Sequence, residues 1–161
     1  MSTDLAIHKR GTLSQSWERS KRWPLGNRIF SLMLGRMARY SGSIGATVLE
    51  LETGRAVVEL RDRPRVRNHL RSIHAIALMN LGELVTGVCV MYQVDGRGRG
   101  IVRHLEMDYL KKARGTITAT CTTQVPLTPG DHDFEARGEL RNSEGELVAT
   151  VCAHWALQVQ G

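Results

Sequence analysis

Cysteine is scarce in this sequence, with three among 161 residues. Cys89, Cys121 and Cys152 lie far apart on apolar segments, with no CxxC pair and no histidine at a usual metal-ligand spacing. This pattern excludes a disulfide framework and argues against a structural metal site. We therefore expect three reduced core cysteines in a cytoplasmic protein that holds no metal.

Long uninterrupted apolar runs are also lacking. A membrane-spanning helix needs about 18 or more predominantly apolar residues, and the longest apolar stretch here, residues 73–92, contains His74, Asn80 and Glu83. That composition favours a buried helix over a membrane span. Residues 1–22 are polar throughout and do not resemble a signal peptide, so we expect no membrane insertion and a cytoplasmic location.

The positive charge is concentrated at one end of the sequence. The formal net charge is +6, and residues 1–40 carry eight Lys or Arg against two acidic residues while the remainder balances. Such an excess suits an anionic partner (nucleic acid, an acidic membrane or a phosphorylated cofactor), or it is a solvated basic helix face. The sequence has no clustered aromatic residues and no helix-turn-helix or zinc-finger spacing, so we expect no nucleic-acid partner.

The organisation along the chain predicts one domain. Residues 1–22 are expected to be a flexible basic segment, and residues 23–161 a single domain that is long enough to bury a core. Residues 23–40 carry apolar side chains at helical spacing, which predicts an amphipathic helix at the start of this domain.

Two strands and a buried helix are expected next. The strands cover residues 43–52 and 55–60 and are joined by a tight turn at Thr53-Gly54. An arginine-rich loop leads into a helix over residues 72–92 that is apolar around most of its circumference. Helices of this kind are buried within a larger structure.

After a glycine-rich turn at residues 95–100, the apolar period changes to two. Four alternating segments between Ile101 and Val159 predict four consecutive strands in an antiparallel meander. A sheet that is apolar on one face needs a cover, and only the helix at 72–92 is apolar enough to provide it. The expected fold is therefore α+β: a six-stranded antiparallel sheet wrapped around a central helix, with an extra N-terminal helix. This arrangement is the hotdog fold.

The stretch from Asn68 to Glu83 carries a motif. Asn68 is followed six residues later by His74, and Glu83 comes nine residues after that. The spacing resembles that of hotdog thioesterases of the 4-hydroxybenzoyl-CoA and phenylacetyl-CoA type, and residues 107–115 resemble a strand-end motif of the same superfamily. The likeness runs from about residue 23 to residue 155 and is greatest to a bacterial hotdog branch known as a domain of unknown function.

The resemblance implies roles for the motif residues in hydrolysis of an acyl-CoA thioester. Glu83 would act as nucleophile or general base, and the Ala75 N–H would stabilise the oxyanion at the helix N-terminus, where free N–H groups and the positive dipole end converge. Asn68 would orient the water or the carbonyl, and His74 would polarise it. Structural alternatives remain open: Asn68 as a cap, His74 as a hydrogen-bonded residue of the first turn, and Glu83 as the partner of an interface arginine.

Helix geometry predicts that the site forms between two protomers. At about 100° and 1.5 Å per residue, His74 and Glu83 face opposite sides of one helix, roughly 13 Å apart along its axis. A two-fold partner would bring Glu83 of one chain to Asn68 and Ala75 of the other. We therefore expect a homodimer or homotetramer, in which Asn80 lines the acyl pocket or bonds across the dimer.

Basic residues are the candidates for the phosphates of CoA, which enters as part of the substrate; no separate cofactor is expected. They are Arg71, Lys111, Lys112 and Arg114. The thioesterase pattern usually has Gly where this chain has Arg71, and a second small residue where it has Ile76. An arginine there either blocks acyl-CoA or clamps its phosphate, so a non-catalytic acyl-CoA-binding or regulatory module is the alternative to the enzyme.

Overall fold

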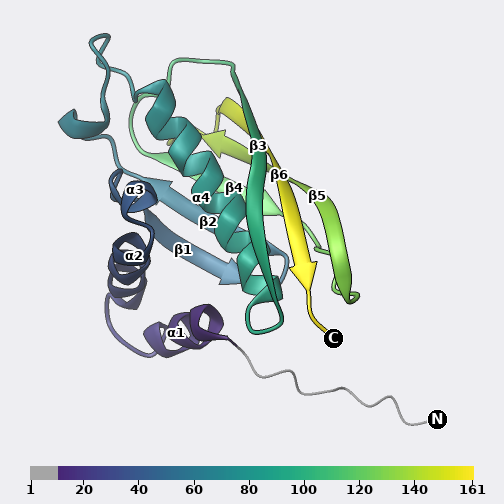
Figure 1. Cartoon of the computed structure of the whole chain (residues 1–161). Coiled ribbons are helices and arrows are strands. Elements are labelled where there is room, and N and C mark those ends of the chain that lie inside the picture. The colour runs from purple at the N-terminus through teal and green to yellow at the C-terminus, as the bar shows by residue number, and fades with distance from the viewer. Residues whose placement is uncertain (1–10) are drawn as a thin grey trace.

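The computed structural model describes residues 11–161 and confirms the α+β hotdog architecture (Figure 1). The elements are α1 (Thr12–Ser20), α2 (Gly26–Met37), α3 (Arg39–Gly42), β1 (Thr47–Glu52), β2 (Arg55–Leu60), a 3-10 turn (Pro64–Val66), α4 (Ala75–Val94), β3 (Gly98–Tyr109), β4 (Ile117–Thr122), β5 (Gly130–Arg141) and β6 (Leu147–Val159). The central helix thus begins and ends two to three residues later than expected.

The six strands form one antiparallel sheet in the order β1-β2-β4-β5-β6-β3. The prediction of a four-strand meander is wrong for β3, which pairs with β6 at the sheet edge instead of with β4. Only β4, β5 and β6 follow one another as a meander. Alternating burial indicates that a segment is a strand, but it does not indicate which strand will pair with it. The pairing depends on strand length and position, and β3 and β6 have similar lengths of 12 and 13 residues.

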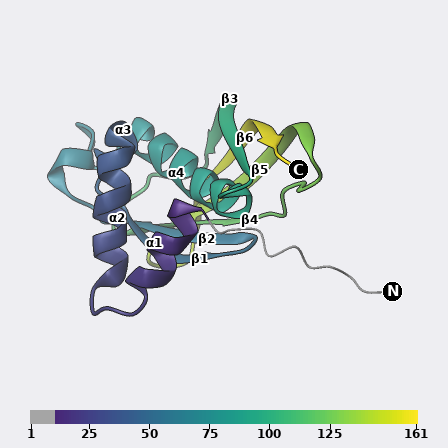
Figure 2. The same ribbon diagram turned by 60° about the horizontal axis from the view of Figure 1, so that its bottom comes forward.

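Helix α4 lies in the concave face of the sheet, with β1, β2 and β4 below it and β3, β6 and β5 curving up beside it (Figure 2). Its residues Leu81, Val85 and Val90 are fully buried. Gly82 permits the close approach, because a Cβ there would lie within 3.0 Å of the Val151 side chain. By length and hydropathy α4 would be able to cross a membrane, but its contacts with all six strands make it the core helix.

The N-terminal region differs from the expected flexible segment. Residues 12–20 form α1, and its Trp17 is 3% exposed. The Trp17 ring lies edge-on to Phe30 of α2 with a centroid separation of 5.0 Å. The Ser14 N–H and hydroxyl donate to the Asp95 carboxylate at 2.7 and 2.8 Å. A buried aromatic side chain therefore docks α1 against α2, although the polar composition of this segment did not predict a helix. Residues 1–10 of the expected flexible segment lie outside the described residues.

Candidate functional site

The N-terminus of α4 is capped by His74. Its Nδ1 accepts a hydrogen bond from the Ile76 N–H at 3.1 Å, and its carbonyl accepts from the Leu78 N–H at 3.1 Å. Because Nδ1 is an acceptor, the ring proton of neutral His74 sits on Nε2. The hydrogen bonds thus give His74 a structural role and leave one N–H that can donate outward.

Ala75 begins α4, and its two backbone groups have different surroundings. Its carbonyl accepts a hydrogen bond from the Tyr109 hydroxyl at 3.0 Å, which ties the end of β3 to the start of the helix. Partial burial raises the pKa of Tyr109, so this hydroxyl remains a donor. Within residues 11–161, the Ala75 N–H has no hydrogen-bond partner. It is one of the free donors that a helix N-terminus offers to an anion.

The loop before α4 is organised by Asn68. The side-chain oxygen of Asn68 accepts from the Leu70 N–H at 2.9 Å and from the Ser72 N–H at 3.1 Å. Its backbone N–H donates to the Ser72 carbonyl at 2.8 Å. Both hydrogen bonds that the Asn68 side-chain oxygen accepts therefore come from the loop itself. This agrees with the structural role that was the alternative for Asn68.

Arg71 has a left-handed backbone conformation, with φ of 56°. This conformation favours glycine, because a Cβ crowds the backbone there. Glycine is the usual residue at this position in the thioesterases that the motif resembles, and the left-handed backbone explains that preference. This chain has the same backbone conformation with an arginine in place of the glycine. The Arg71 side chain is exposed.

Glu83 and Asn80 lie under the short helix α3. The Ser41 hydroxyl donates to Glu83 Oε2 at 3.2 Å, and the Asn80 amide donates to the Tyr40 carbonyl at 3.1 Å. Burial raises the pKa of Glu83 above its ordinary value, and the bond from Ser41 partly offsets this rise. The carboxylate is a poorly solvated group with one neutral hydrogen-bond donor, which makes it a stronger base than an exposed carboxylate.

Asn80 has an unsatisfied atom as well. Its side-chain oxygen is buried and has no hydrogen-bond partner within the described chain. A buried, unpaired amide oxygen costs free energy unless another donor reaches it. The side-chain NH2 of Asn80 therefore holds α3 in place, while its side-chain oxygen remains available to accept another hydrogen bond.

A hollow of about 300 Å³ opens beside this helix end. His74, Ile76 and Asn80 form its helical wall, and Tyr40, Arg65 and Arg67 lie opposite. Arg67 is held by Asp62, with 2.6 Å between Nε and Oδ1, and this pairing lowers the pKa of Asp62. The structure thus brings His74 and Asn80 together with two arginines of the loop, whereas Glu83 lies one turn further along α4.

A second hollow of about 280 Å³ lies between α2, α3 and the start of β1. Leu32, Leu34, Val48 and Leu84 give it apolar walls, and Ser41 lies at its edge. Residues of α3 line both hollows, and Ser41, which lines the second, donates to Glu83.

The basic residues after β3 lie near the same end of α4. The Ala113 carbonyl accepts from the Ile73 N–H at 2.8 Å, which holds this loop against the one preceding the helix. Lys112 and Arg114 are exposed, while Lys111 Nζ is 2.6 Å from Glu146. The expected phosphate-binding residues are therefore close to the arginine loop in space, although they are 40 residues away in sequence.

Two polar groups of this region were not found from the sequence. Ser41 meets Glu83 across 42 residues, and Tyr109 meets Ala75 across 34. Tyr109 lies in the strand-end motif at 107–115, which singled out the segment but not the hydroxyl. No local pattern marks Ser41, because its role depends only on where α3 packs.

Solved structures share this architecture. A genomics target protein has a TM-score of 0.75 at 27% identity, covering 91% of this chain and 98% of its own. A probable thioesterase of Pseudomonas aeruginosa has a TM-score of 0.70 at 22% identity, covering 86% and 97%. The PaaI protein of the Escherichia coli phenylacetic acid degradation operon has a TM-score of 0.68 at 16% identity, covering 93% and 98%.

The family comparison covers most of the sequence. No curated protein sequence matches this chain. The profile of the domain of unknown function DUF4442 matches residues 26–157, from the first residue of α2 almost to the end of β6. The chain therefore belongs to the DUF4442 family and has the hotdog fold.

Proposed function

We propose that this protein hydrolyses an acyl-CoA thioester to a free acid and CoA. The observation that carries the proposal is Glu83, a partly buried carboxylate with a raised pKa on the central helix, beneath α3 and hydrogen-bonded by Ser41. A carboxylate in this environment removes a proton from water more readily than an exposed one. Several solved hotdog structures of similar fold are described as thioesterases, which supports the choice of reaction.

The reaction assigns one role to each group. Glu83 takes a proton from water, and the water oxygen attacks the thioester carbonyl carbon; direct attack by the carboxylate is the nucleophilic variant. The Ala75 N–H, the helix dipole and the outward N–H of His74 stabilise the negative oxygen. The C–S bond then breaks, and the sulfur of CoA takes the proton. Asn68 positions the loop that holds His74 through its side-chain oxygen, and its side-chain NH2 group orients the water or the carbonyl.

A homodimer is part of this proposal, and a homotetramer extends it. Glu83 and Ala75 are eight residues apart on one helix, which is about 12 Å of axial rise, so one thioester does not reach both within a protomer. The outer edge of β3 is unpaired in the sheet order and carries the exposed Ile101 and Tyr109. Open strand edges of this length pair readily with a second strand, and a two-fold axis there would bring the two halves of the site together.

The substrate has two further contacts in this proposal. The phosphates of CoA bind Arg65, which lines the first hollow, and the exposed basic side chains of the two loops near this end of α4. These are Arg71, Lys111, Lys112 and Arg114. The acyl group enters the apolar second hollow beside Leu84. The compartment that fits an acyl-CoA substrate and three free, buried cysteines is the cytoplasm.

The test is thiol release from a panel of short, medium, long and aryl acyl-CoA esters. Glu83→Gln is expected to lower turnover by at least about a hundredfold, the usual contribution of a general base, while binding and oligomeric state persist. Glu144→Gln, an exposed turn residue, is the matched control and should turn over like the wild type. Unchanged turnover in Glu83→Gln would rule out the role assigned to this residue.

The second candidate is a non-catalytic acyl-CoA-binding or regulatory module, and Arg71 favours it. A long cation replaces the usual glycine at the loop beside the oxyanion donor. Equilibrium dialysis with a non-hydrolysable acyl-CoA distinguishes the two functions. Tight binding without thiol release by the wild-type protein supports the module, and turnover that rises in Arg71→Gly shows that the arginine obstructs an active site.

A further inference from the structure

Metal-ligating side chains gather on the outer face of the sheet, away from α4 and the candidate active site. His104 Nε2 lies 3.7 Å from Glu106 Oε2, and His154 Nε2 lies 3.7 Å from Glu106 Oε1. The ligand atoms of these three residues are all within 4.8 Å of one another. Cys152 Sγ is 3.7 Å from His154 Nε2. Two imidazoles and a carboxylate therefore form one cluster, and a thiol lies at its edge beside His154.

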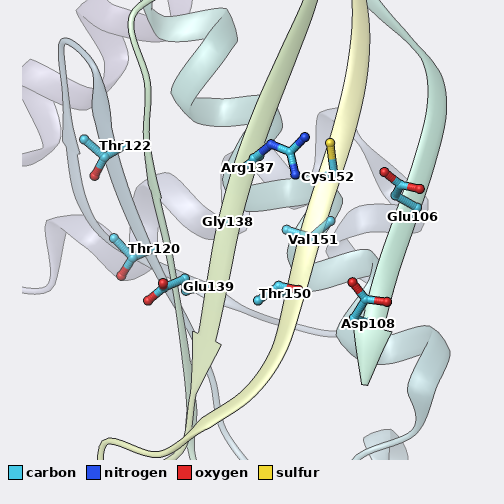
Figure 3. Close-up of a pocket in the computed structure, with 10 residues that line it drawn as sticks. All are labelled: Glu106, Asp108, Thr120, Thr122, Arg137, Gly138, Glu139, Thr150, Val151 and Cys152. Carbon is cyan, nitrogen blue, oxygen red and sulfur yellow. The ribbon is translucent and has the colours of Figure 1, made fainter. Parts of the chain in front are cut away.

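Strand register produces this cluster. His104 is directly opposite His154, and Glu106 is opposite Cys152, on the neighbouring strands β3 and β6. Alternation along each strand places both pairs on the same face, and an irregularity between Val102 and His104 sets that register. Figure 3 shows Cys152 and Glu106 side by side on these strands, with Arg137 of β5 on the other side of Cys152.

We propose that this face binds a zinc ion through His104, Glu106 and His154, with the Cys152 thiolate as fourth ligand. Tetrahedral zinc with bonds of about 2.0–2.3 Å holds its ligand atoms roughly 3.3–3.7 Å apart. His104 and His154 each lie 3.7 Å from a different oxygen of Glu106, and Cys152 lies 3.7 Å from His154. The His104, Glu106 and His154 side chains are 62%, 59% and 37% exposed. They can therefore close around an ion by side-chain rotation alone.

The surroundings of the cluster suit a cation. Glu135 Oε1 lies 3.5 Å from His154 Nδ1, on the side of the ring away from the Nε2 atom that would bind the metal. This carboxylate–histidine arrangement is the usual outer support of a zinc ligand. The cation beside Cys152, Arg137, is paired with Glu135 at 2.8 Å, and Asp108 adds a further negative charge along β3.

The proposal reverses the expectation of no metal, and it does not depend on the proposed hydrolysis. Residues two apart on a strand point to the same face of the sheet. His104 and Glu106 form one such pair and Cys152 and His154 form another, and neither pair has the spacing of zinc-finger ligands. The cluster needs both strands, and β3 was expected beside β4. Only the observed β3–β6 pairing brings the four residues together.

The experiment is zinc titration of the chelator-treated, full-length protein against a chromophoric competitor. We expect one zinc per protomer, an affinity at least about tenfold weaker in His154→Gln and in Glu106→Gln, and no change in His69→Gln, which removes another exposed imidazole. Circular dichroism establishes that each variant is folded.

Cobalt(II) substitution tests the fourth ligand. A thiolate-to-cobalt charge-transfer band is expected in the wild type and should vanish in Cys152→Ser; its absence from the wild type would overturn the assignment of Cys152. The site as a whole is overturned if the wild type does not bind zinc, or if His154→Gln and Glu106→Gln bind it as tightly as the wild type does.

Discussion

Glu83 and Glu106 carry the same carboxyl group on opposite sides of the curved sheet, and their surroundings give them different chemistry. Glu83, on the concave side, is partly buried with Ser41 as its hydrogen-bond donor, and burial raises its pKa. The Glu106 side chain is 59% exposed on the outer face and lies between two imidazoles. Desolvation makes the first a candidate base, whereas neighbouring ligands make the second a candidate metal contact.

The largest expected effect tests how far the concave side depends on close packing. Leu81 is fully buried two residues before Glu83, so Leu81→Ala leaves a cavity in the core and should reduce the free energy of unfolding by about 2–5 kcal/mol. Urea denaturation measures this loss. Leu127→Ala is the control, because Leu127 is 39% exposed; an equal loss in both variants would contradict the assigned core.

The pH dependence of stability tests the state of Glu83 directly. Its pKa in the folded protein is raised above 4.5, so the stability due to the protonated form is complete below about 4.5 and is lost as the pH rises through the folded pKa. Glu83→Gln lacks this titration and should become more stable relative to the wild type over that interval. Urea unfolding of both proteins between acidic and neutral pH measures the difference; a constant difference would contradict a raised pKa.

A smaller effect is expected from the hydrogen bond of Ser41. Ser41→Ala removes the donor that lowers the pKa of Glu83, so the pKa should rise further and the acidic limb of the pH–rate profile should move to higher pH. The loss of thiol-release rate near neutral pH is expected to stay within about tenfold, the equivalent of one ordinary hydrogen bond. Ser143→Ala, in a turn between β5 and β6, is the control and should keep the wild-type pH–rate profile. If Ser41→Ala also leaves the profile unchanged, Ser41 does not influence the pKa of the catalytic base.

The smallest effect is expected at Arg71. Its φ of 56° is unfavourable for a residue with a Cβ, so Arg71→Gly relieves strain but gives the unfolded chain more freedom, and the net change in unfolding free energy should be within about 1 kcal/mol. Thermal unfolding measures it. Arg71→Ala is the matched variant, because it removes the charge but keeps a Cβ in the left-handed conformation. It should be less stable than Arg71→Gly, and the reverse order of stability would show that the backbone at this position is not strained.

Some elements were predictable because their signals are local. Strand β2 occupies residues 55–60 as expected, because the turn at Thr53-Gly54 and the apolar residues that follow both lie within a few residues. The hotdog architecture followed from one helix apolar on all sides and segments of period two. The motif residues Asn68, His74 and Glu83 were found by spacing, but the occupied side-chain oxygen of Asn68 and the cap of His74 were not decided by it.

Other features depended on contacts between distant segments. Docking of α1 rests on Trp17 meeting Phe30, and the position of β3 rests on its match in length with β6. The sequence by itself determined the buried helix, the strands and the fold class, because hydrophobic periodicity acts over a few residues. The tertiary structure alone decided the order of the strands, the raised pKa of Glu83 and the cluster at His154, because pairing and desolvation arise only when remote parts of the chain exclude water together.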